Sequence, residues 1–126
     1  MTSPPGCREL LVFEDAAASL RALTDGLRES GCRVDVAEEL DALLDTFVAA
    51  GGHRVALIAP EVPNVVAARA ATSLTAVDPA LRVVVFGHDT RSPGWPEVGV
   101  VRLAAHHPAA RAALGAVLRV LATSDG

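Results

Sequence analysis

Five short apolar runs alternate with segments of helical periodicity along this chain, and that alternation constrains the fold more than any other feature. The runs are too short for helices and lack polar alternation, which is typical of strands buried on both faces of a sheet. The predicted strands cover residues 8–13, 32–37, 54–59, 81–87 and 98–105. The fourth, "LRVVVFG", is rich in β-branched residues and is the most strand-like.

Apolar residues recur at helical spacing in four of the segments between or after these strands. Gly31 and Pro79 supply stops for two of the helices, and Asn64 can cap a third. The predicted helices cover residues 17–30, 40–50, 65–77 and 109–122. The remaining segment, "HDTRSPGWPE" at 88–97, has two prolines and a glycine within four residues, so a fourth helix between strands four and five should be short or missing.

Strands that alternate with helices at this spacing predict right-handed crossovers and a doubly wound parallel sheet. We expect a flavodoxin-like α/β fold with strand order 2-1-3-4-5. The 126 residues, 51% of them hydrophobic, suffice for one core but not two. The prediction is therefore one domain over 1–126, with flexible tails at 1–6 and 123–126.

Charge and composition exclude several classes of function. The net charge is −4 and the basic residues are scattered, which argues against a nucleic-acid partner. All eleven basic residues are arginine, so chemistry that needs a lysine amine is excluded. The sequence has no signal-like start and no run of membrane-spanning length, so a cytoplasmic protein without a membrane partner is expected. Cys7 and Cys32 are too few for a disulfide framework and are interpreted as buried thiols, with a bridge or redox role as the alternative.

The carboxyl ends of the strands are where a doubly wound sheet gathers its chemistry. Four short stretches reach that edge: the pair Glu14 and Asp15, residues 59–61, residues 87–89 and residues 105–107. Any function of the sheet must use these stretches. His53 lies at the opposite end of strand three and is expected on the surface.

The order "LLVFED", "SLRALTDGLRESGCRVDVAEELDALL", "VALIAPEVPN" and "VDPALRVVVFG" resembles the receiver domain of bacterial two-component response regulators over nearly the whole chain. The resemblance implies an acidic pair that holds Mg²⁺ after strand one and an aspartate after strand three that accepts a phosphoryl group. It also implies a Thr or Ser after strand four and a Lys after strand five.

Only the first of these four positions keeps its chemistry in this sequence. Glu14 and Asp15 match the acidic pair, whereas counting back four residues from Pro63 places Ala59 at the phosphoacceptor position. The separation between Asp15 and Ala59 also fits the receiver pattern, so the register has not slipped. The hydroxyl position is Gly87.

The lysine position is His106 when counted from Gly99, or His107 when counted back from Pro108. The chain therefore resembles a degenerate receiver, a pseudo-receiver. Covalent phosphoryl transfer needs a carboxylate nucleophile, so phosphorylation-dependent signalling is not expected. No catalytic motif suggests an enzyme.

We therefore predict a phosphorylation-independent signalling module that acts by protein–protein interaction. Trp95 is either a cover over the core or an exposed interaction anchor. Arg111 and Arg119 of the last helix are further candidate interaction residues, and pairing into homodimers through that helix is compatible with the sequence.

The alternative function is a sensor of a small molecule or a divalent metal in the cleft at the carboxyl ends of the strands. No resident cofactor is expected, but Glu14, Asp15 and Glu61 could bind Mg²⁺ or another divalent metal, with histidines nearby. The competing interpretation is that the acidic pair serves a loop and a helix cap while the histidines face solvent. Similarly, Ala59 and Gly87 either widen the cleft or simply pack.

Overall fold

The computed structural model describes residues 9–14, 20–49, 53–91, 94–96, 99–103 and 119. Five strands form one parallel sheet in the order β2-β1-β3-β4-β5. The strands are β1 (Glu9–Phe13), β2 (Arg33–Ala37), β3 (Val55–Ile58), β4 (Arg82–Phe86) and β5 (Val100–Leu103). The flavodoxin-like architecture and its strand order are thus confirmed.

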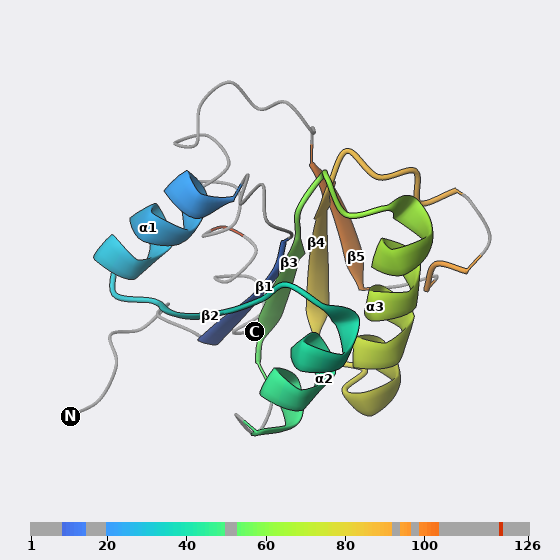
Figure 1. The fold of residues 1–126 in the computed structure, drawn as a ribbon, viewed down its shortest axis with the longest axis horizontal. Helices are drawn as coiled ribbons and strands as arrows, with labels where there is room; N and C mark the ends of the chain where they lie inside the picture. The colour runs from blue at the N-terminus through green and yellow to red at the C-terminus, as the bar shows by residue number, and fades with distance from the viewer. Residues whose placement is uncertain are drawn as a thin grey trace.

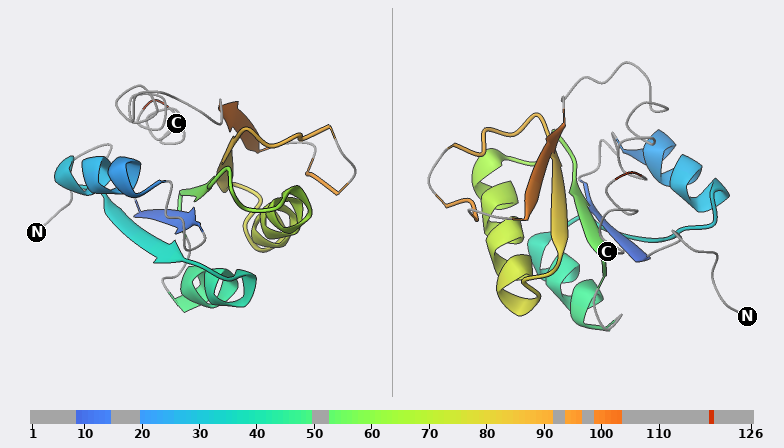
Figure 2. Two further views of the ribbon diagram at one scale, coloured as in Figure 1. Left: turned by 45° about the horizontal axis from the view of Figure 1, so that its top comes forward. Right: turned by 180° about the vertical axis from the view of Figure 1, so that it is seen from behind.

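Three helices form the crossover connections between successive parallel strands from β1 to β4. They are α1 (Arg21–Glu29), α2 (Leu40–Ala49) and α3 (Asn64–Val77). Figures 1 and 2 show α1 on one face of the sheet and α2 and α3 next to each other on the opposite face. The predicted final helix lies outside the described residues except for Arg119, which is helical and exposed. No helix within the described residues is long and apolar enough to cross a membrane.

The continuous apolar runs are explained by the position of β1, β3 and β4 at the centre of the sheet. Leu11, Leu57 and Val84 are completely buried, as are their neighbours along each strand, which is typical of central strands in a parallel sheet. The edge strand β2 alternates instead, with Val34 buried and Val36 exposed. The helices α2 and α3 contribute Leu43, Phe47, Ala67, Ala70, Ala71 and Leu74 to the same core.

The end of α1 depends on one glycine. Gly31 has a φ of 93°, in the left-handed region that a side chain disfavours. Its N–H donates to the carbonyl of Arg28 at 2.9 Å, and the N–H of Cys32 donates to the carbonyl of Leu27 at 3.0 Å. This turn leads directly into β2 and buries Cys32; Cys7 lies outside the described residues.

The connection between β4 and β5 contains turns and no helix in its described parts, 87–91, 94–96 and 99. The expectation of a short or missing fourth helix is therefore met there. Its proline and glycine content explains the result, because proline lacks an N–H for helical bonding and Gly94 has a φ of 100°.

Two local expectations were wrong. His53 is only 4% exposed, because the ring stacks on Phe47 of α2 at 5.7 Å between centroids and bonds to Asp35 of β2. Asn64 is the first residue of α3 and Pro63 occupies the cap position. The Asn64 side chain is engaged by Asp89 instead, since its Oδ1 accepts the Asp89 N–H at 3.1 Å.

Candidate functional site

The carboxyl ends of β1 and β3 lie side by side and place Glu14 next to Ala59. Phe13 pairs with Ile58 in the parallel register, so the two residues that follow leave the sheet together. The Ala59 N–H donates to the Phe13 carbonyl at 2.9 Å, and the Glu14 N–H donates to the Ala37 carbonyl of β2 at 3.1 Å. Backbone hydrogen bonds therefore fix both positions.

Ala59 presents a buried methyl group at this edge. Its side chain is completely inaccessible to solvent, and its carbonyl accepts the Val62 N–H at 3.2 Å across a tight turn. The turn brings Glu61 to a half-buried position. The residue that directly follows β3 thus supplies no nucleophile and no metal ligand from its side chain.

Glu14 is a buried carboxyl group that is 6% exposed. Burial raises its pKa above the ordinary value of 4.5, and the negative charges of Glu61 and Glu38 raise it further. The hydrogen bond from the Leu20 N–H to Oε2, at 3.2 Å, and the charge of Arg21 act in the opposite direction. Glu14 therefore holds its proton more tightly than an exposed glutamate does, chiefly because it is buried.

The described residues do not supply a complete metal site. They contain no group of three His, Cys, Asp or Glu side chains placed to hold an ion. Glu14 and Glu61 are close enough for their charges to interact, but Asp15, the third predicted ligand, lies outside the described residues. Two carboxylates alone match only part of the oxygen set that Mg²⁺ takes.

The end of β4 is joined to the turn after β3 by a buried histidine. His88 is 5% exposed, and its Nε2 donates to the Val62 carbonyl at 2.9 Å. The ring lies 5.9 Å from that of Trp95, which is half-buried and packs against the core. Gly87, which directly precedes His88, is exposed and has a φ of 75°. Among the candidate histidines, His88 therefore has a packing role rather than a solvent-facing one.

The remaining candidates are only partly described. Arg119 is exposed on a helical turn, whereas His106, His107 and Arg111 lie outside the described residues. The site at the carboxyl edge is thus built from Glu14, Ala59 and Glu61, with Gly87 beyond the β3 turn.

No protein-family model and no curated protein matches the sequence. Solved structures match its fold. NtrX from Brucella abortus, in complex with ADP, aligns over 94% of this chain with a TM-score of 0.73 and 16% identity; this chain covers 27% of that one. A response regulator receiver domain protein from Clostridium thermocellum aligns over 93% of this chain and 95% of its own, with a TM-score of 0.68 and 16% identity.

A third match is the response regulator protein TrrA from Thermotoga maritima in complex with Mg²⁺ and BeF. It aligns over 88% of this chain and 98% of its own, with a TM-score of 0.62 and 16% identity. This chain has the receiver-domain fold.

Proposed function

We propose that the chain is a degenerate receiver domain that regulates a signalling pathway by binding a protein partner, without being phosphorylated. The observation that carries the proposal is the buried methyl group of Ala59 at the end of β3. A covalent phosphoryl carrier needs a nucleophilic carboxylate that an incoming donor can reach. The buried Ala59 side chain offers neither the oxygen nor the access.

Neighbouring groups do not replace that nucleophile. Glu14 is buried and its Oε2 accepts the Leu20 N–H, so its carboxylate is not accessible to an incoming phosphoryl donor. Gly87 supplies no hydroxyl at the end of β4. A receiver fold that keeps its core but has lost the side chains for phosphoryl transfer still has surfaces that bind other proteins, and it regulates through them.

The fold neighbours support the signalling part of the proposal, because they are described as response regulators or receiver domains. In such a role the domain acts in the cytoplasm as a non-enzymatic module, alone or as a homodimer. Trp95, Arg111 and Arg119 are its candidate interaction residues, although Trp95 has much of its surface against His88 and the core.

A divalent cation is the second candidate ligand, and one observation favours it. The charge of Glu61 raises the pKa of buried Glu14, so a cation between them would relieve repulsion. Asp15 could complete the set, and the domain would then respond to the metal itself. A small-molecule ligand at the same edge has no comparable observation in its favour.

Thermal melting with Mg²⁺, with Mg²⁺ plus beryllofluoride, and with Zn²⁺ tests these functions, because a ligand that binds only the folded state raises Tm. TrrA is the positive control, since its structure contains Mg²⁺ and BeF. We expect beryllofluoride to add nothing beyond Mg²⁺ for this chain. A further rise with beryllofluoride would overturn phosphorylation independence, and a rise with metal alone would favour the cation sensor.

A further inference from the structure

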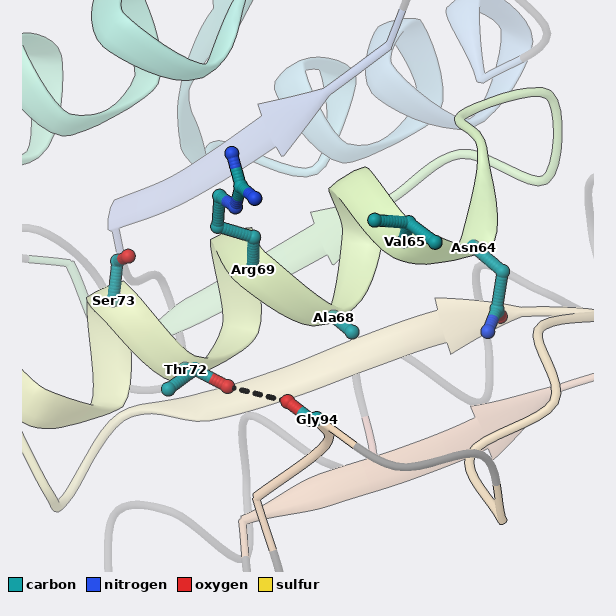
Figure 3. A pocket seen from close by; sticks show the side chains of 7 residues that line it. All are labelled: Asn64, Val65, Ala68, Arg69, Thr72, Ser73 and Gly94. Atoms are coloured by element: carbon teal, nitrogen blue, oxygen red, sulfur yellow. Dashed lines mark hydrogen bonds between the residues drawn. The ribbon is translucent and has the colours of Figure 1, made fainter.

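A hollow of about 520 Å³ lies along the outer side of α3, next to the connection between β4 and β5 (Figure 3). It is lined by α3 side chains from Asn64 to Ser73 and by Gly94. Its volume is in the range of ligand-binding pockets. It borders the stretch where turns replace the helix that would otherwise follow β4.

The α3 side chains form two rows, each with four-residue spacing. Figure 3 shows Ala68 and Thr72 on the side of the loop and Val65, Arg69 and Ser73 on the other side. Rows of this spacing are the ridges that helices use when they pack against each other. The lined part of α3 extends for about 15 Å, or nearly three turns, which suits a helix better than a compact small molecule.

We call this hollow the α3 groove. One of its walls is the connection between β4 and β5, and hydrogen bonds hold that wall in place. Thr72 Oγ1 donates to the Gly94 carbonyl at 2.7 Å (Figure 3). Asn64 Oδ1 accepts the Asp89 N–H at 3.1 Å, and Asp89 Oδ1 in turn accepts the Arg91 N–H at 3.1 Å. A groove held in this way is formed before a partner arrives, which lowers the ordering cost of binding.

The chemistry of the lining selects the partner. Val65 is apolar and 72% exposed, and Ala68 provides a small buried floor. Arg69 is exposed and makes no ion pair with any residue that the structure describes. None of the lining residues is acidic, although the chain as a whole has a net charge of −4. The complementary ligand therefore combines apolar side chains with a carboxylate.

We propose that this α3 groove binds an acidic amphipathic helix of a partner protein, with a carboxylate of the helix opposite Arg69 and its apolar stripe on Val65 and Ala68. The inference rests on the proposed interaction function and specifies its surface. Gly94, which lines the groove, directly precedes Trp95, so the groove borders that candidate interaction residue.

The test uses the full chain and a phage-displayed library of helical peptides of about 18 residues, or about five turns. Enriched peptides are titrated against the wild type, Arg69→Glu and Val65→Asp. Arg102→Glu and Val48→Asp are matched controls, since Arg102 of β5 is exposed and Val48 of α2 is 67% exposed. Circular dichroism checks that each variant folds.

We expect enriched peptides with carboxylates on one face, and affinity at least about fivefold lower for both groove variants than for the controls. A peptide whose key Glu is changed to Arg should regain affinity for Arg69→Glu. The inference is overturned if no acidic helix is enriched, or if Arg102→Glu reduces binding and Arg69→Glu does not. The melting experiment with beryllofluoride tests the proposed function separately, because it measures phosphoryl-analogue binding near Ala59 and not peptide binding at α3.

Discussion

His53 donates a hydrogen bond from Nε2 to Oδ2 of Asp35 across 2.8 Å. Asp35 lies in β2 and His53 lies just before β3, and these strands are separated in the sheet by β1. The pair therefore links the two strands on either side of β1. The His53 side chain is completely buried, whereas that of Asp35 is 45% exposed.

We expect Asp35→Ala to destabilise the fold, because it leaves the Nε2–H of a buried His53 without its acceptor. The free energy of unfolding should fall by about 1–2 kcal/mol. Urea denaturation at neutral pH measures the change. Asp45→Ala, on the exposed side of α2, is the control and should change stability by less than about 0.5 kcal/mol. Equal effects of the two substitutions would show that the pair does not stabilise the protein.

The sheet could be predicted from the sequence because its signals are local. Runs such as "LRVVVFG" identify buried strands, and the helical spacing between them fixes the crossovers and hence the strand order. The burial of His53 could not be predicted, because it depends on Phe47 and Asp35 from two other elements. A single histidine before a strand contributes no periodicity that would reveal such contacts.

The candidate site could be predicted only as far as strand ends determine it. Counting along β3 and β4 located Ala59 and Gly87, which follow the two strands in the structure. The bond from His88 to the Val62 carbonyl joins residues 26 positions apart, and no spacing rule indicates it. The groove along α3 was missed for a similar reason, since it depends on how Gly94 packs beside the helix.

Glu14 should make stability depend on pH. Its pKa in the folded protein is raised above 4.5, chiefly by burial, so the folded state holds this proton more tightly than the unfolded state. The stability that this provides is present below pH 4.5 and is lost as pH rises through the folded pKa. Glu14→Gln keeps an oxygen for the Leu20 N–H but cannot ionise. It should therefore become more stable relative to the wild type as pH rises through that window.

Urea denaturation of the wild type and Glu14→Gln at several values between about pH 4 and 8 measures this difference. Glu39→Gln, at an exposed position, controls for the loss of one negative charge. A stability difference between Glu14→Gln and the wild type that stays constant across the range would contradict the assignment.

Ala59→Asp should destabilise the protein and create a response to Mg²⁺. The new carboxylate would replace a fully buried methyl group beside Glu14, so we expect a loss of about 3 kcal/mol. Mg²⁺ should restore part of it, since Asp at this position would join Glu14 and Glu61 as an oxygen ligand. Melting with and without Mg²⁺ tests this, with Ala59→Asn as the uncharged control. An equal response to Mg²⁺ in both variants would rule out such a ligand set.

Thr72→Val should loosen the β4–β5 loop. It should also change the fluorescence emission of Trp95, the single tryptophan of the chain. The substitution keeps the shape of the side chain but removes the hydroxyl that donates to the Gly94 carbonyl at 2.7 Å. Trp95 follows Gly94 directly, so a less tightly held loop should expose its ring and shift its emission to longer wavelength. The free energy of unfolding should fall by about 1 kcal/mol. Thr75→Val is the control, because the Thr75 hydroxyl donates within α3 to the Ala71 carbonyl at the same 2.7 Å. If both variants leave the emission unchanged, the bond from Thr72 does not hold the loop, and the wall of the α3 groove must be fixed by Asn64 and Asp89 alone.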